Sequence, residues 1–255
     1  MDLKNKITVI TGVTGGLGRV VAREFAAQGA KLVLVGTNAE RLAQLVAELK
    51  LTPESYETVV ADLTQSEAAQ EVLEAALAKF GRVDILFNFI GGWIAGKPVS
   101  TVPREEVENM LAQHFWTSFN LAQAFIPHML ENHWGRYVII STPSVGAPPA
   151  NSLPYTVGKA AEETLMLTLS EELKNSGVTA NVLRVRSIDV SHKREREPSP
   201  KNASWTMPEE ISAALLYLCS AAVSYTHPRA HETKANLVCR LLLEQKTQSQ
   251  PNPAD

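Results

Sequence analysis

The sequence predicts a single α/β domain of the Rossmann type, a doubly wound parallel sheet with helices on both faces. Short runs rich in β-branched residues alternate with longer helical patterns along the 255 residues. These short runs are almost entirely apolar, which is typical of strands that are covered on both faces. A chain of this length commonly forms one domain with a sizeable core.

Six short apolar runs are the candidate strands. We expect strands at residues 6–11, 31–35, 57–60, 83–88, 136–140 and 178–185. A helical pattern lies between each run and the next, so we expect neighbouring strands to run parallel.

The segments between the strands carry apolar residues at three-and-four spacing. This spacing predicts helices at residues 16–28, 39–49, 65–80, 104–130, 154–174 and 208–220. Pro103 and Pro208 stand at the starts of two of them, where proline is well tolerated. Residues 191–206 are polar and charged, and Pro198 and Pro200 argue against any regular element there. We expect a flexible loop in that segment.

Composition excludes several classes of function. The chain has 24 Lys and Arg against 27 Asp and Glu, a formal charge of −3, so nucleic acid is not an expected partner. It has no apolar stretch of 18 residues and no signal-like start, which predicts a soluble, cytoplasmic protein without a membrane partner. Cys219 and Cys239 lack His or Cys neighbours at metal-ligand spacing. We expect two free thiols and no metal site.

A glycine-rich turn directly follows the first candidate strand. It reads Thr11-Gly12-Val13-Thr14-Gly15-Gly16-Leu17-Gly18, and a helical pattern begins within it. Glycines permit a tight turn and close approach of a ligand, while the free N–H groups and positive end of the helix attract a pyrophosphate. This context predicts a dinucleotide phosphate loop. The alternative is a tight turn without a ligand.

Tyr155 and Lys159 begin another helical pattern, four residues apart. This spacing places both side chains on one helix face. An ammonium beside a phenol favours the phenolate and brings a group of ordinary pKa ~10 nearer to working pH, where it can exchange a proton with a substrate oxygen. We therefore expect Tyr155 to be an acid/base with Lys159 as its partner. The alternative is a pair that packs or is solvated.

Together these motifs resemble the short-chain dehydrogenase/reductase family, whose pattern is Thr-Gly-x-x-x-Gly-x-Gly near the start and Tyr-x-x-x-Lys further on. The resemblance covers residues 4–220. It implies oxidation or reduction of a small-molecule alcohol or carbonyl with NAD or NADP, in a homodimer or homotetramer. The cofactor-binding residues that it implies are Gly12, Thr14, Gly15, Gly16, Leu17, Gly18, Thr37, Asp62, Leu63, Asn88, Gly91, Tyr155, Lys159 and Ile188.

The family's other two catalytic positions are changed. This chain has His114 where an asparagine is expected and Thr142 where a serine is expected. Threonine keeps a hydroxyl for the substrate oxygen, and Ser144 is the rival for that role. Histidine is larger than asparagine and ordinarily titrates near pH ~6.5. A proton relay through His114 and a histidine that only packs or hydrogen-bonds are the two interpretations.

The cofactor pocket also departs from the family pattern. Phe89 and Ile90 replace Asn-Ala, and Val185-Arg186 replaces Pro-Gly beside the nicotinamide. Trp93 either forms part of the wall of an apolar substrate cleft or packs as an ordinary aromatic residue.

The end of the second strand bears on the choice of cofactor. It reads Gly36-Thr37-Asn38 and lacks the acid that commonly hydrogen-bonds the ribose of NAD. No carboxylate there would repel a 2′-phosphate, and Thr37, Asn38 and Arg41 can donate hydrogen bonds. We therefore favour NADP(H) and keep NAD(H) as the alternative.

The C-terminal part does not resemble the family. We expect the dinucleotide-binding and catalytic domain at residues 1–222 and a divergent tail at residues 223–255. No glycine follows Gly177, so the glycine pair that ordinarily ends the last strand is absent. Either a shifted or read-through reading frame supplies a tail that is not native, or the end is divergent and residues 236–243 supply the last strand.

The leading interpretation is an NAD(P)-dependent oxidoreductase. Tyr155 exchanges the proton, Lys159 holds the ribose and lowers the pKa of Tyr155, and Thr142 orients the substrate oxygen. The alternative is a catalytically impaired dinucleotide-binding sensor or scaffold, which the changed His114, the missing Pro-Gly and the unusual C-terminus favour.

Overall fold

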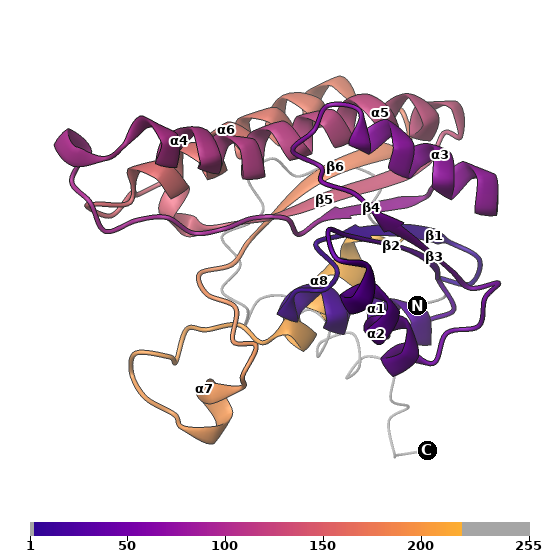
Figure 1. Cartoon of the computed structure of the whole chain (residues 1–255), viewed down its shortest axis with the longest axis horizontal. Helices are drawn as coiled ribbons and strands as arrows, with labels where there is room; N and C mark the ends of the chain where they lie inside the picture. Colours follow the sequence, from indigo (N-terminus) through magenta and orange to yellow (C-terminus); the bar gives the residue numbers. More distant parts are fainter. Residues whose placement is uncertain (1–2, 221–255) are drawn as a thin grey trace, which may run out of the picture.

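Six parallel strands form one sheet in the order β3-β2-β1-β4-β5-β6 in the computed structural model, which describes residues 3–220 (Figure 1). The strands agree with the predicted ones to within two residues at every end, because apolar runs of this length bury both faces. They are β1 (Ile7–Thr11), β2 (Lys31–Gly36), β3 (Tyr56–Val60), β4 (Ile85–Asn88), β5 (Gly135–Ser141) and β6 (Val178–Arg184).

The strand order reverses beside β1. The chain builds β1, β2 and β3 outward in one direction, then returns to pair β4 with the free side of β1. In open parallel sheets, ligands bind outside the carboxyl ends of the strands at such a reversal. The topology therefore places the candidate site beyond Thr11 and Asn88, the last residues of β1 and β4.

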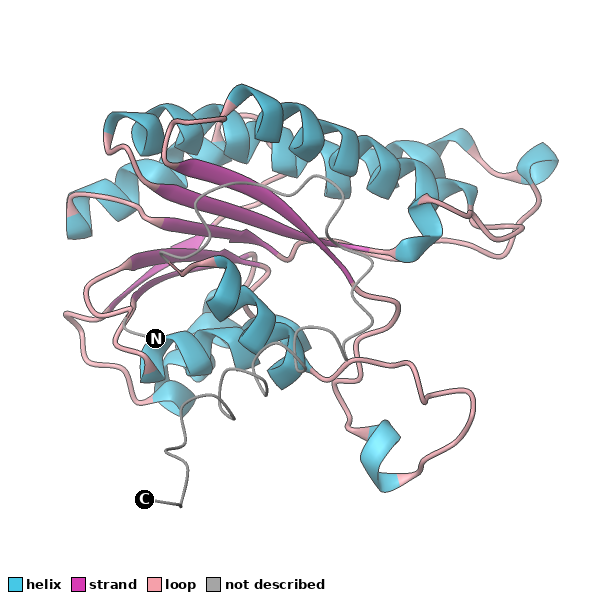
Figure 2. Ribbon diagram, turned by 180° about the vertical axis from the view of Figure 1, so that it is seen from behind, coloured by secondary structure: helices cyan, strands magenta, loops and turns pink. Residues whose placement is uncertain are grey.

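Helices cover both faces of the sheet (Figures 1 and 2). One face carries α1 (Gly16–Ala27), α2 (Ala39–Leu49) and α8 (Pro208–Leu218). The other carries α3 (Ala68–Phe80), α4 (Arg104–Leu111), α5 (Thr117–Glu131) and α6 (Leu153–Glu172). Two apolar clusters fill the space between the layers, and Phe25 of α1 meets Phe87 of β4 edge to face with the ring centroids 5.0 Å apart. The predicted doubly wound fold is confirmed.

The helix predicted at residues 104–130 is interrupted. A π-helical turn, Ala112–Trp116, separates α4 from α5, and it contains His114. The hydroxyl of Thr117 donates to the backbone oxygen of Gln113 at 2.7 Å and so satisfies a carbonyl in this widened turn. Such turns inside α-helices occur frequently at functional sites.

The expectation of a loop without regular structure at residues 191–206 is wrong. A single helical turn, α7 (Lys193–Arg196), lies within it. The buried carboxylate of Asp189 accepts hydrogen bonds from the backbone N–H groups of Lys193 and Arg194 at 2.9 and 2.7 Å, which holds this turn against the end of the preceding segment. Thr206 in turn hydrogen-bonds the backbone of Ser187. The polar composition of the segment did not predict this turn, because the turn depends on hydrogen bonds to Asp189.

The sequence also predicted two free cysteines and the absence of membrane-spanning helices. In the part of the chain that the structure describes, every helix is too short or too polar to cross a lipid bilayer. Cys219 is a buried free thiol. Cys239 and the predicted tail at residues 223–255 lie outside the described residues.

Candidate active site

Two adjoining cavities open at the carboxyl edge of the sheet. The first, of about 340 Å³, lies between the glycine-rich loop, the segment after β4 and the start of α6. The second, of about 500 Å³, lies between Trp93, the segment after β5 and the start of α6. Both are lined by Tyr155, Arg186 and Ser187. The predicted tyrosine therefore stands where the two cavities meet.

The glycine-rich loop forms one wall of the first cavity. Gly12 has φ +62°, and a Cβ there would come within 2.9 Å of the backbone of Phe89. A Cβ on Gly18 would lie 2.6 Å from the Cα of Val13, so the loop packs directly on itself. Helix α1 begins at Gly16 with no side-chain cap. Its first N–H groups are therefore available to an anion, as a dinucleotide pyrophosphate requires.

The phenol of Tyr155 is half-buried, and Tyr155 lines the second cavity together with Thr142. Burial raises the pKa of Tyr155, the hydrogen bond from Thr142 opposes this rise, and the negative charge of Glu162 adds to it. The expected lowering of this pKa is therefore wrong for the structure as described. At neutral pH the phenol keeps its proton.

Thr142 and Ser144 lie side by side in the second cavity. The backbone N–H of Ser144 donates to the hydroxyl oxygen of Thr142 at 3.3 Å, and the two hydroxyls are also 3.3 Å apart. Of these rivals, Thr142 is the one that opposes the rise in the pKa of Tyr155. This favours Thr142 over Ser144 as the hydroxyl that orients the substrate oxygen. Ser144 is its hydrogen-bond partner.

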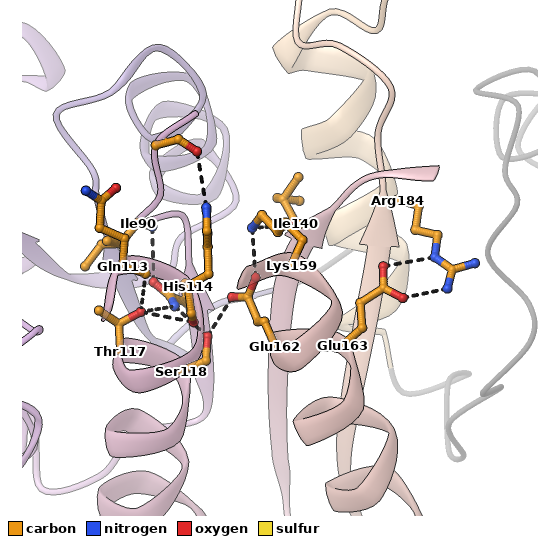
Figure 3. A network of polar contacts seen from close by, with 12 residues as sticks. Ile90, Gln113, His114, Thr117, Ser118, Ile140, Lys159, Glu162, Glu163 and Arg184 are labelled. Carbon is orange, nitrogen blue, oxygen red and sulfur yellow. Dashed lines mark hydrogen bonds and ion pairs between the residues drawn. The ribbon is translucent and has the colours of Figure 1, made fainter. Parts of the chain in front are cut away.

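Lys159 is buried and bound to the protein by two hydrogen bonds. Its Nζ donates to the backbone oxygen of Ile140 at 2.7 Å and to Oε2 of Glu162 at 2.8 Å (Figure 3). Glu162 is fully buried, three residues further along the same helix. An ammonium has three donors, so one N–H remains for a ligand in the first cavity, which Lys159 also lines.

A chain of buried hydrogen bonds fixes the ionisation of Glu162. Oδ1 of Asn88 accepts from the backbone N–H of Ile90 at 3.1 Å, so the amide nitrogen must face Ser118, to which it donates at 2.8 Å. The hydroxyl proton of Ser118 therefore points to Oε1 of Glu162, 2.7 Å away. Both carboxyl oxygens thus accept hydrogen bonds, one from Ser118 and one from Lys159, as a carboxylate requires.

Opposing effects act on the ionisation of Glu162. Burial raises the pKa of its carboxyl group, while Lys159 and the Ser118 hydroxyl oppose that rise. Glu163, the next residue, is engaged separately, because Arg184 donates to its two oxygens at 3.0 and 2.6 Å. Glu162 therefore compensates the charge of Lys159, whose remaining N–H still faces the first cavity.

His114 lies against Tyr155 in the first cavity. The two ring centroids are 5.7 Å apart in an edge-to-face arrangement, and Nε2 lies 3.2 Å from the backbone oxygen of Gly92. Burial, together with the charge of Lys159, lowers the pKa of His114 to about 3. The expectation that it titrates near its ordinary value is therefore wrong. The imidazole stays neutral, which argues against a relay through its protonated form.

The predicted cofactor residues divide into two groups. Those that line the first cavity are Gly12, Gly15, Gly16, Leu17, Gly18, Asn88, Gly91, Tyr155, Lys159 and Ile188. Thr14, Thr37, Asp62 and Leu63 line neither cavity. Asp62 instead accepts hydrogen bonds from the N–H and hydroxyl of Thr64, and Leu63 is buried in the core. The side-chain amide of Asn88 hydrogen-bonds Ser118 and the backbone N–H of Ile90 inside the protein.

Sequence reasoning missed Glu162 and Ser118. A signal was present for the first. Lys159, Glu162, Met166 and Leu169 recur at three-and-four spacing on the buried face of α6, so two charged residues of opposite sign stand on an otherwise apolar stripe. Ser118 gives no comparable signal, because its role depends on the packing of α5 against α6.

Comparison with known proteins gives a consistent family. A family profile described as short chain dehydrogenase matches residues 6–201. The 1,6-dihydroxycyclohexa-2,4-diene-1-carboxylate dehydrogenase of Pseudomonas putida is 30% identical over 243 residues, with 87% of this chain and 88% of that protein covered. An uncharacterized oxidoreductase of Staphylococcus aureus is 29% identical over 215 residues, with 84% of this chain and 91% of that protein covered.

Solved structures share the fold. A short chain dehydrogenase from Bacillus anthracis superposes with a TM-score of 0.80 at 24% identity, covering 89% of this chain and 94% of that chain. A 3-ketoacyl-(acyl-carrier-protein) reductase from Brucella melitensis, solved with NADH, gives a TM-score of 0.77 at 24% identity, covering 88% and 94%. At this level of identity the likeness concerns the fold.

The buried ion pair generates a prediction about stability. Glu162→Leu leaves the Lys159 ammonium buried without its partner, and we expect it to lower the free energy of unfolding by about 3–5 kcal/mol in urea denaturation. The double variant Lys159→Met with Glu162→Leu removes both charges and recovers most of that loss. Glu171→Leu is the control, because this residue pairs with Lys174 on the exposed end of the same helix. Equal losses for Glu162→Leu and Glu171→Leu would contradict the assignment.

Proposed function

This chain belongs to the short-chain dehydrogenase family, and we propose that its Tyr155 is the acid/base of the family reaction, with Lys159, Glu162 and Thr142 setting its state. The protein is accordingly an NAD(P)-dependent oxidoreductase that acts on alcohol or carbonyl groups. The observation that carries the proposal for Tyr155 is its place between the two cavities, in the second of which it lies together with Thr142.

The first cavity suits the pyrophosphate and the nicotinamide half of a dinucleotide. Its glycine wall leaves no room for side chains, and the uncapped start of α1 offers N–H groups to phosphate. The remaining N–H of Lys159 suits a ribose hydroxyl. When bound, the nicotinamide supplies or accepts a hydride. Substrate then occupies the second cavity, where the hydroxyl of Thr142 and the phenol of Tyr155 can both meet its oxygen.

The raised pKa of Tyr155 bears on the direction in which the residue works. A protonated phenol can give its proton from Oη to a carbonyl oxygen, whereas the reverse step needs phenolate. Glu162 compensates the charge of Lys159 and so favours the protonated form. We propose that Tyr155 acts as a general acid in carbonyl reduction at neutral pH.

For the cofactor we propose NADP(H), with NAD(H) as the alternative. The segment that follows β2 carries Thr37 and Asn38 and no carboxylate. Asn38 begins α2 by accepting a hydrogen bond from the N–H of Arg41 at 2.9 Å, so its amide nitrogen still has donors for a phosphate.

Tyr155→Phe provides the main test. We expect it to lower turnover of a panel of aldehydes and ketones by about 10²–10⁴-fold, because proton transfer is lost, while NADPH binding measured by fluorescence is retained. Tyr217→Phe, a change of an exposed tyrosine on α8, is the matched control. Parallel titration with NADH decides the cofactor preference. Binding of a dinucleotide without any turnover would instead favour a sensor or scaffold.

His114→Asn tests the histidine separately. Since the imidazole is neutral above pH of about 3, we expect turnover to be retained or raised and the pH profile between ~5 and ~8 to keep its shape. A loss of more than about a hundredfold would show that the imidazole is a specific part of the reaction, and the packing interpretation would then fail.

A further inference from the structure

Arg186 is a cation that the proposed chemistry does not use. It follows β6, is exposed, and lines both cavities together with Tyr155. Within residues 3–220, its guanidinium makes no ion pair and no side-chain hydrogen bond, in contrast to Arg184 two residues earlier, which binds Glu163 through two contacts.

The backbone around Arg186 is fixed on both sides. The N–H of Val185 donates to the backbone oxygen of Ser141 at 2.8 Å, and the N–H of Thr206 donates to the backbone oxygen of Ser187 at 2.9 Å. The arginine therefore projects from a position that the sheet and the segment after it hold in place. Its position at the junction of the cavities follows from the fold.

The charges of the two cavities are not balanced. Among the residues that the structure describes, no Asp or Glu lines either cavity, and the lining cations are Lys159 and Arg186. Glu162 compensates Lys159, and His114 is neutral. Within the described part of the chain, Arg186 therefore contributes a positive charge that no carboxylate compensates to the cavities that Tyr155 also lines. An anion in such a partly enclosed site is attracted more strongly than in bulk water.

We propose that Arg186 binds an anionic group of the substrate, with a carboxylate as the chemical class that fits a guanidinium best. The substrate is then an aldehyde, ketone or alcohol that also carries a carboxylate. This inference rests on the proposed function, because it assumes that the reacting oxygen lies at Tyr155. The dinucleotide pyrophosphate is the competing anion, but no residue of the glycine-rich loop lines the second cavity, which Arg186 does line.

Two probes test the proposal, an anionic aldehyde and its neutral methyl ester. Binding of 4-formylbenzoate and of methyl 4-formylbenzoate is measured by calorimetry on the full chain saturated with oxidised dinucleotide, which cannot reduce them. We expect wild type to prefer the acid. Arg186→Leu should weaken binding of the acid by about 10–100-fold, as the loss of a hydrogen bond to a charged group does, and leave the ester unchanged.

Two controls separate the explanations. Arg186→Lys keeps the charge and should retain part of the preference, and Arg104→Leu changes an arginine that is 90% exposed on α4 and should alter nothing. Equal binding of acid and ester by wild type, or equal weakening of both by Arg186→Leu, overturns the proposal. So does a loss confined to dinucleotide affinity, which would assign the guanidinium to the pyrophosphate.

The same probes keep this inference distinct from the proposed function. Reduction of 4-formylbenzoate with NADPH is followed in wild type and in Tyr155→Phe. A preference for the acid in binding, with reduction that Tyr155→Phe does not affect, would uphold the anion site and contradict the role of Tyr155. Reduction that is lost in Tyr155→Phe, without any preference for the acid in binding, would uphold the role of Tyr155 and contradict the anion site.

Discussion

The pairing of Lys159 with Glu162 is the constraint from which the properties of the site follow. An ammonium buried on α6 needs compensation, because an unpaired charge in the interior is costly. The carboxylate of Glu162 supplies this compensation at 2.8 Å from Nζ of Lys159. Its other oxygen accepts a hydrogen bond from Ser118, which accepts one from Asn88, and Asn88 accepts one from Thr11 at the end of β1. Helix α6 is thereby joined through hydrogen bonds to β1 and β4, the two strands at whose ends the first cavity lies.

This arrangement changes what each neighbouring group can do. His114 lies beside Lys159 in a buried position and stays neutral, so it acts through its shape and its contact with Gly92. Tyr155 keeps its proton because burial and Glu162 both oppose ionisation. Arg186 lies outside this pair and lines both cavities, which is why we propose it as the binding site of a substrate anion. The buried carboxylate of Glu162 thus compensates Lys159 inside the protein, while the charge of Arg186 remains open to the cavities.

The fold was predictable from the sequence because its signals are local. Apolar runs such as 31–35 and the glycines from Gly12 to Gly18 identify strands and a phosphate loop without knowledge of their neighbours. The break at Ala112–Trp116 and the helical turn α7 were not predicted, since each is held by particular hydrogen bonds, from Thr117 and to Asp189.

The site was predictable in its parts and not in its electrostatics. Tyr155 and Lys159 were identified by their spacing and Thr142 by the family resemblance, and the structure places all three at the two adjoining cavities. The pKa directions of Tyr155 and His114 were not, because they depend on burial and on Glu162, whose partner Ser118 lies on another helix. Tertiary packing, which decides these quantities, leaves little trace in a single sequence.

Spectroscopic titration of the Tyr155 phenol tests this account most directly. The phenolate absorbance of the chain is followed with pH, and the same curve for Tyr155→Phe is subtracted, with and without the additional change Glu162→Gln. We expect a Tyr155 pKa above the ordinary tyrosine value in wild type and a lower one in Glu162→Gln, because removal of the negative charge removes a cause of the rise. A wild-type pKa below the ordinary value, or no fall in Glu162→Gln, would contradict it.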